Sequence, residues 1–262
     1  MLSRATYQAE LFLLSLSFFT RIPVPASVPY STERMNQSGR YFSLVGVLLG
    51  LICYGVYSLC ALVLPEHLSI LLMMVFSLLL TGAFHEDGLT DMADGIGGGM
   101  TTERRLAIMK DSRIGTYGAS ALIMALLLKY SVLSSLAMQS SMLQILLVGY
   151  GLSRAVAASL IYDMPYVSDT QTSKSKPLAS RQTTRELGIL LFFGIIPCIG
   201  LDFSIVLIIG CVCCLLRFAL KRWLLCRIGG FTGDCLGGVQ QITELTIYLI
   251  LAATLMPQGT LL

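Results

Sequence analysis

Long apolar runs alternate with short polar segments along most of the chain. Seven runs are long and apolar enough to predict membrane-spanning helices. They cover residues 41–64, 68–84, 117–138, 142–162, 187–201, 203–220 and 238–256. A weaker run at residues 5–20, interrupted by Glu10 and followed by Pro23 and Pro25, predicts a short helix that either lies in the membrane interface or crosses the membrane. We therefore expect an all-α, polytopic integral membrane helix bundle with about seven transmembrane helices, forming a single domain over residues 1–262.

Composition agrees with a membrane protein. Of the 262 residues, 55% are hydrophobic and only 13% are charged, and the mean hydropathy is +0.76, whereas a soluble domain carries about 25% charged residues. The eight cysteines show no metal-binding or disulfide spacing, and most lie in apolar runs, so no disulfide framework is expected. The net charge of +3 includes no basic run typical of nucleic-acid binding. The expected macromolecular environment is a lipid bilayer, with no nucleic-acid partner.

Basic residues are concentrated in alternate loops. These loops lie near residues 21–40, 104–113, 174–185 and 221–227. The intervening loops carry no lysine or arginine, so the positive-inside rule predicts a multi-pass protein of the inner (cytoplasmic) membrane whose basic loops are cytoplasmic. Two polar motifs, at residues 85–118 and 229–244, then fall on the cytoplasmic side, where they can share one site.

The first motif follows directly on an apolar run and begins H-E-D-G-L-T-D-M-A-D-G at residues 85–95. At about 100° per residue, a helix through it places its four acids and Thr90 within an arc of about 140°. Glycines at 95 and 97–99 predict the end of the helix, so the acids are expected in its last turns, where the helix dipole disfavours negative charge. Like charges at this spacing also repel, so a cation is expected beside them.

Mg²⁺ is the expected cofactor, because it binds carboxylate oxygens together with the phosphates of a substrate. The predicted metal ligands are Glu86, Asp87, Asp91, Asp94 and Asp234. His85 is expected to form hydrogen bonds beside this cluster rather than to bind the metal. The alternative is a solvated acidic helix end, but ionisable residues at the mouth of a membrane span are usually functional.

Two cations and a second glycine-rich motif extend this interpretation. Lys110 and Arg113 are three residues apart and are predicted to project together toward phosphate oxygens; the alternative is a pair of cations that set topology at the lipid headgroups. In the second motif a helix starting near Thr232 places its polar residues and glycines within an arc of about 120°. That face comprises Asp234, Gly237, Gly238, Gln241 and Glu244. Its N-terminus, at Gly233, suits a phosphate; the alternative is a seam for close helix packing.

Two ionisable residues lie inside predicted spans. Arg154 is placed near the cytoplasmic third of its span and is expected to reach the site, whereas Lys129 is expected to be structural. Asp163, Tyr166 and Asp169 are expected to be solvated. The candidate catalytic residues are then Asp91, Asp234, Lys110 and Arg113, and the candidate substrate-binding residues are Arg154, Gly233, Gln241 and Glu244. This set predicts metal-assisted chemistry on a diphosphate, without an organic cofactor.

At these motifs the chain resembles the cobalamin synthase family, the adenosylcobinamide-GDP ribazoletransferases. The similarity rests on T-R-I-P-V-P at 20–25, the acidic motif at 85–95, M-K-D-S-R-I-G-T-Y-G at 109–118, Ser153-Arg154, and G-G-F-T-G-D-C-L-G-G at 229–238. It implies a transferase that joins adenosylcobinamide-GDP to α-ribazole or its 5′-phosphate, releases GMP and requires Mg²⁺. It also implies corrinoid and nucleoside substrates and, as partners, other cobalamin-pathway enzymes, with a homo-oligomer left open.

Two departures from the family pattern concern the polar loop at residues 166–177, which lacks the expected Arg and Gly, and Gly238, where many relatives have Ala. A CDP-alcohol phosphotransferase ranks second, because that family also holds metal on an acidic helix but has Ala-Arg after its Asp-Gly. An ion-coupled transporter ranks third: transporters tend to place such acids at mid-membrane on broken helices, often with an inverted repeat.

Overall fold

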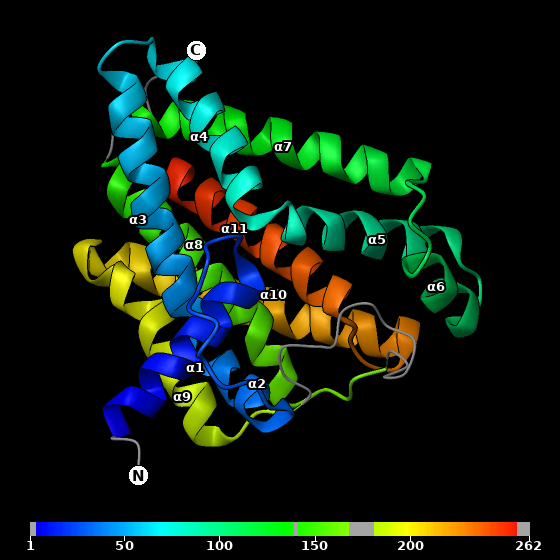
Figure 1. Cartoon of the computed structure of the whole chain (residues 1–262). Coiled ribbons are helices and arrows are strands. Elements are labelled where there is room, and N and C mark those ends of the chain that lie inside the picture. The colour runs from blue at the N-terminus through cyan, green and yellow to red at the C-terminus, as the bar shows by residue number, and fades with distance from the viewer. Residues whose placement is uncertain (1–3, 139–140, 168–180, 256–262) are drawn as a thin grey trace.

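The computed structural model describes residues 4–138, 141–167 and 181–255. Every regular element in these ranges is helical, which confirms the predicted all-α fold (Figure 1). The α-helices are α1 (Arg4–Phe19), α2 (Thr32–Ser38), α3 (Phe42–Ala61), α4 (Glu66–Thr81), α5 (Phe84–Gly98), α6 (Thr102–Met109), α7 (Thr116–Ala137), α8 (Met142–Ser159), α9 (Thr184–Ile195), α10 (Phe203–Ile228) and α11 (Gly233–Leu255).

Five helical segments of the described chain are long and apolar enough to cross a membrane, or up to six if α4 and α5 count as one bent span. They are Thr32–Ala61, Thr116–Ala137, Met142–Tyr162, Phe203–Ile228 and Gly233–Leu255. The expected count of seven is not confirmed. The run at 187–201 is divided: α9 has only 12 residues and continues as a 3₁₀ turn that contains Pro197, whose missing N–H cannot extend an α-helix.

The junction between α4 and α5 bends by 84°. Gly82 and Ala83 both adopt left-handed backbone conformations there, with φ of 67° and 55°. The segment that follows α1 packs onto this turn, because the Arg21 backbone N–H donates to the Leu80 carbonyl at 2.8 Å. Helix α5 therefore starts afresh at Phe84.

The expectation that the acids crowd the last turns of their helix was wrong. Glu86 and Asp87 lie in the first turn of α5, where the helix dipole favours negative charge. The helix does end among the following glycines, as predicted, with Gly98 as its last residue and Gly99 as its C-cap. Gly95 and Gly97 also allow Met109 and Tyr117 to pack closely against α5, since a Cβ atom at either glycine would lie within 2.7 Å of one of these side chains.

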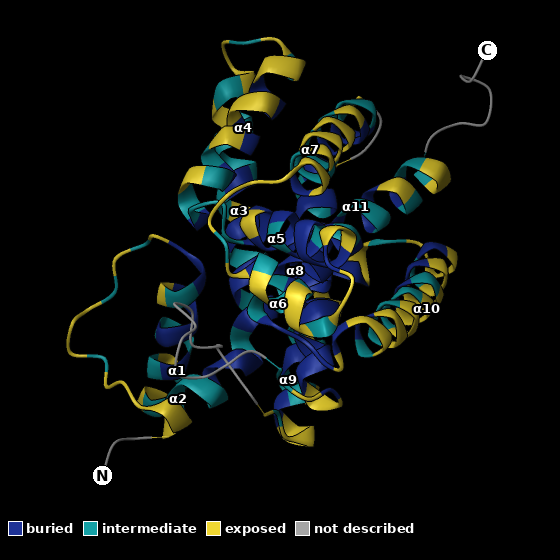
Figure 2. Cartoon of the chain, turned by 90° about the vertical axis from the view of Figure 1, so that its right-hand side faces the viewer, coloured by how far each residue is buried: buried dark blue, intermediate teal, exposed yellow. Residues whose placement is uncertain are grey.

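Helix α8 forms the centre of the bundle and is buried along most of its length (Figure 2). Helices α3, α9 and α11 pack around it. The outer faces of α4, α7 and α10 carry exposed large apolar side chains, among them Leu79, Ile123 and Leu215. Exposed apolar surface of this extent is typical of helices that face lipid.

Helices α5 and α11 cross at glycines, and this crossing brings the two polar motifs together. A Cβ atom on Gly88 would lie 2.8 Å from the Asp234 carbonyl oxygen and 3.1 Å from the Gly237 Cα atom. Only a glycine on α5 fits so close to another backbone. The segment after α8 joins the same region, since the Val167 backbone N–H donates to the Phe231 carbonyl at 3.0 Å.

Candidate active site

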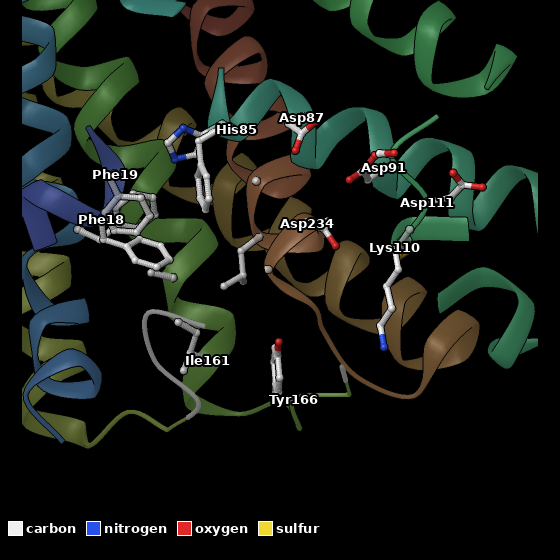
Figure 3. A pocket seen from close by; sticks show the side chains of 18 of the residues that line it. Phe18, Phe19, His85, Asp87, Asp91, Lys110, Asp111, Ile161, Tyr166 and Asp234 are labelled. Carbon is white, nitrogen blue, oxygen red and sulfur yellow. The ribbon is translucent and has the colours of Figure 1, made fainter. Parts of the chain in front are cut away.

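A cavity of about 440 Å³ lies where α1, α3 and α5 meet the start of α11, the end of α8 and the loop between α6 and α7 (Figure 3). Its acidic and polar lining residues are Asp87, Asp91, Lys110, Asp111, Ser112 and Asp234. Its aromatic and apolar lining residues include Phe18, Phe19, Phe42, Phe84, His85, Ile161, Tyr166 and Leu236, and Gly233 and Gly237 line it through backbone atoms. The cavity therefore draws on both motifs that the sequence singled out.

Three of the predicted metal-binding acids lie at the cavity. Asp87 and Asp91 are one turn apart on α5, and Asp234 lies in the first turn of α11, facing them (Figure 3). The Asp91 carboxylate experiences repulsion from both Asp87 and Asp234. Within the described chain, none of these three acids forms an ion pair. Close carboxylates without a counter-ion favour the binding of a cation.

The donor set fits Mg²⁺ only in part. Carboxylate oxygens are the ligands that this ion prefers. However, among the described residues no three His, Cys, Asp or Glu side chains converge closely enough to hold a metal ion by themselves. Mg²⁺ usually binds to one or two carboxylates, several waters and the phosphates of a substrate. The acids at the cavity fit that second arrangement.

Lys110 and Arg113 do not project together. Lys110 lines the cavity, and Figure 3 shows its side chain extending below Asp91 and Asp111, with the nitrogen at the end that points away from these carboxylates. The Arg113 guanidinium lies outside the lining, 87% exposed, and donates to both oxygens of Asp111 at 2.6–3.1 Å. These hydrogen bonds lower the pKa of the Asp111 carboxyl to about 2. The structure thus places one of the two predicted phosphate clamps at the cavity.

Asp94 has a different environment from the other acids of its motif. It is buried, and its two carboxylate oxygens accept hydrogen bonds from the backbone N–H groups of Gly115, at 2.7 Å, and Gly118, at 2.8 Å. It therefore caps the N-terminus of α7. This acid was predicted to bind metal, but in the structure it does not line the cavity and instead holds the loop that carries Lys110.

Four other predicted site residues lie in a buried polar network behind the cavity. Glu86 accepts from Gln241 at 2.9 Å, and Gln241 donates to Gln240 at 3.0 Å. Gln240 donates to Glu244 at 2.6 Å.

Glu244 also forms an ion pair with Lys129 at 2.6 Å and lies 3.7 Å from Arg154. Glu86, Arg154, Gln241 and Glu244 were predicted to bind metal or substrate, but they do not line the cavity and instead contact one another or other buried side chains. Lys129, which was expected to be structural, is buried in this network and does not line the cavity.

The aromatic part of the cavity was missed by the sequence analysis. The rings of Phe19 and Phe42 stack with centroids 3.7 Å apart, and the His85 ring lies nearly parallel to both, at 5.9 and 5.7 Å. The one sequence feature that could have indicated these aromatic lining residues was the position of Phe18 and Phe19 directly before the motif at residues 20–25. Aromatic residues in apolar runs do not otherwise differ from core residues.

Two residues expected to be solvated have partners. Tyr166 lines the cavity and packs edge-on against Phe231, with ring centroids 5.5 Å apart. Asp163 pairs with Arg217 at 2.8 Å and Lys221 at 2.7 Å, which joins the end of α8 to α10. The third, Asp169, lies outside the described residues.

The fold and the cavity define an integral membrane protein whose binding site combines carboxylates and a lysine with aromatic rings. The chain belongs to the cobalamin-5-phosphate synthase family, whose model matches residues 11–252. The resemblance seen in the motifs is thereby confirmed.

Three curated relatives, each named adenosylcobinamide-GDP ribazoletransferase, illustrate the match. The relative from Vibrio vulnificus (strain YJ016) is 61% identical over 247 residues, which cover 94% of this chain and 97% of that protein. The relative from Vibrio cholerae serotype O1 (strain ATCC 39541 / Classical Ogawa 395 / O395) is 58% identical over 95% of each chain. The relative from Shewanella halifaxensis (strain HAW-EB4) is 50% identical over 93% of this chain and 95% of its own. No solved structure matches this chain.

Proposed function

We propose that this chain is a Mg²⁺-dependent transferase that joins adenosylcobinamide-GDP to α-ribazole, or to its 5′-phosphate, and releases GMP. The observation that carries the proposal is the meeting of Asp87, Asp91 and Asp234 at one cavity, although they come from motifs about 140 residues apart. Membership of the family and the names of the relatives support the reaction. They also favour it over a CDP-alcohol phosphotransferase and an ion-coupled transporter.

In this proposal one or two of the carboxylates of Asp87, Asp91 and Asp234 would hold Mg²⁺, which would supply positive charge to the phosphate oxygens of the diphosphate. A ribose hydroxyl of the acceptor attacks the phosphorus atom that bears the corrinoid. The new P–O bond forms as the bond to the GMP oxygen breaks, and Asp91 or Asp234 accepts the hydroxyl proton. Lys110 contributes a point charge to the phosphate oxygens from the rim of the cavity.

We also propose that the cavity opens to the cytoplasm at the inner membrane, which is supported by the positive-inside distribution of the basic loops. The membrane would then gather this chain with other enzymes of the pathway that pass on the corrinoid. Full activity of detergent-solubilised protein with purified substrates would argue against that role for the bilayer.

The test is GMP release from adenosylcobinamide-GDP and α-ribazole 5′-phosphate by protein in liposomes, with Mg²⁺ or with EDTA. We expect metal-dependent release with formation of cobalamin phosphate, and a loss of at least a hundredfold in Asp91→Asn, as for the removal of a group that stabilises charge in the transition state. Asp163→Asn is the matched control, because its ion pairs lie outside the cavity. No turnover by the wild-type protein would refute the reaction, and full turnover by Asp91→Asn would refute the site.

A further inference from the structure

The cavity changes in chemical character along its length. The carboxylates and Lys110 lie at one side, and Phe18 and Phe19 lie at the opposite side (Figure 3). There an aromatic cluster lines the cavity, composed of Phe18, Phe19, Phe42, Phe84 and His85. Its members contact one another through ring pairs at centroid distances of 3.7–6.0 Å. A ligand that fills the cavity must therefore present an aromatic or apolar part to this cluster and an anionic part to the metal-binding side.

The aromatic cluster offers few hydrogen bonds. Its side chains are four phenyl rings and one imidazole, and none carries a hydroxyl, amide or carboxylate. Guanine has several hydrogen-bond donors and acceptors around its edge. The His85 imidazole, whose Nε2 atom has no hydrogen-bond partner among the described residues, could pair with at most one or two of them, and the others would lose water here without gaining a partner from the cluster. A benzimidazole has two apolar ring faces and a single free ring nitrogen when it is attached to ribose. The cluster therefore suits a benzimidazole better than a guanine.

The size of the cavity also favours a nucleoside over a corrinoid as the group that fills it. Its volume of about 440 Å³ lies toward the low end of the roughly 300–1,000 Å³ of small-molecule sites. This space accommodates a nucleoside together with a diphosphate, but not a complete corrinoid with its attached nucleotide. The rim at Lys110 and Ser112 is exposed, so the larger substrate can approach there and leave its macrocycle outside.

We propose that the aromatic cluster binds the base of the acceptor nucleoside, the benzimidazole of α-ribazole, by stacking and apolar contact. The ribose then lies toward the carboxylates, which face the diphosphate of the second substrate. This inference rests on the proposed function and assigns one substrate to one part of its site. Phe18 and Phe84 become specificity-determining residues for the acceptor.

The best variant is Phe18→Leu. Phe18 and Phe84 are only half-buried, whereas Phe19 and Phe42 are 5% and 4% exposed and stack on each other, so their replacement would disturb the core. Leucine retains apolar volume but removes the aromatic face. Phe12→Leu is the matched control, because Phe12 lies on the same helix, packs against Tyr41 and does not line the cavity.

The first measurement is equilibrium dialysis of α-ribazole against purified protein in nanodiscs, without the second substrate. We expect Phe18→Leu to raise the Kd and the KM for α-ribazole by about three- to tenfold, the effect of losing one aromatic contact. The KM for adenosylcobinamide-GDP, kcat, and the Ki for inhibition by GMP should stay within twofold of the wild type. Phe12→Leu should change none of these constants.

The opposite pattern would overturn the inference. If Phe18→Leu raises the Ki for GMP and leaves the Kd for α-ribazole unchanged, the cluster binds guanine. If Phe18→Leu does not fold, Phe84→Leu tests the same cluster against the same expectations. Failure of the proposed function is a separate result: a wild-type protein that binds α-ribazole through Phe18 but releases no GMP would refute the reaction and retain the binding site.

Discussion

The buried ion pair between Lys129 and Glu244 provides the sharpest test of how the bundle is stabilised. The side chains are 6% and 1% exposed, and the Nζ and Oε1 atoms are 2.6 Å apart. We predict that Lys129→Met lowers the free energy of unfolding by about 3 kcal/mol, because it leaves a buried carboxylate without its main partner. This value is the low end of the range for buried pairs, since Arg154 stays 3.7 Å from Glu244.

Charge counting predicts the outcome of the double variant. With all groups ionised, Lys129 and Arg154 contribute +2, and Glu86 and Glu244 contribute −2, so the network is neutral. Lys129→Met gives a net charge of −1, and Glu244→Gln gives +1. Combining the two substitutions restores neutrality. The double variant should therefore be more stable than the sum of the single effects by about 1–3 kcal/mol.

Reversible unfolding in mixed micelles, followed by circular dichroism, measures these free energies. Lys221→Met is the control, because its pair with Asp163 is partly exposed and should contribute at most about 1 kcal/mol. If the free energy of unfolding of Lys129→Met lies within about 1 kcal/mol of the wild-type value, the ion pair between Lys129 and Glu244 does not stabilise the bundle. If the two single effects simply add in the double variant, Lys129 and Glu244 do not interact energetically, contrary to this prediction.

Three further variants test other contacts of the bundle. Gly88→Ala should destabilise the fold by about 1–3 kcal/mol and reduce GMP release, because its methyl group would lie 2.8 Å from a backbone atom of α11. Gly55→Ala is the control and should do neither, because no atom lies within 4 Å of the position of its methyl group. Asp94→Asn should lower the free energy of unfolding by about 1–2 kcal/mol, because it weakens the cap at the N-terminus of α7. It should leave the Mg²⁺ concentration for half-maximal activity unchanged. A large rise in that concentration would show that Asp94 is a metal ligand. For Asp163, partial burial raises the pKa but the ion pairs to α10 lower it overall, so the folded state keeps the carboxylate ionised. Its contribution is fully present above an unfolded pKa of about 3.9 and is lost as the pH falls through the lower folded value. The stability difference from Asp163→Asn should therefore shrink as the pH falls below about 3.9 in acid titrations.

The sequence predicted the all-helical membrane fold and the meeting of the two motifs, because both depend on local patterns. Long apolar runs predict membrane-spanning helices. Glycines beside acids at helical spacing indicated that two polar helices pack closely against each other, and α5 and α11 do so at Gly88 and Gly237. The number of membrane-spanning helices could not be predicted as well from the sequence. It depends on the left-handed turn at Gly82 and Ala83, which ends α4 after only 16 residues, and on the 3₁₀ turn at Pro197, which divides the run at 187–201.

The roles of individual acids could not be separated from the sequence. Four acids share one face of α5, but Asp87 and Asp91 lie at the cavity while Asp94 caps α7 and Glu86 contacts α11. An arc of about 140° is wide enough for one helix to meet three different neighbours. Which neighbour each acid meets is decided by segments that lie far away in the sequence.

The bend after α4 has a consequence for how the protein is assembled. With 16 residues, α4 is about 24 Å long, shorter than the roughly 30 Å hydrocarbon layer. Its continuation, α5, carries buried polar groups that are costly in lipid until they find partners. One such partner of Glu86 is Gln241 on α11, which follows 155 residues later in the chain. The α4–α5 pair therefore stays incompletely packed until α11 has been synthesised, and the cavity that draws on both α5 and α11 forms only after that.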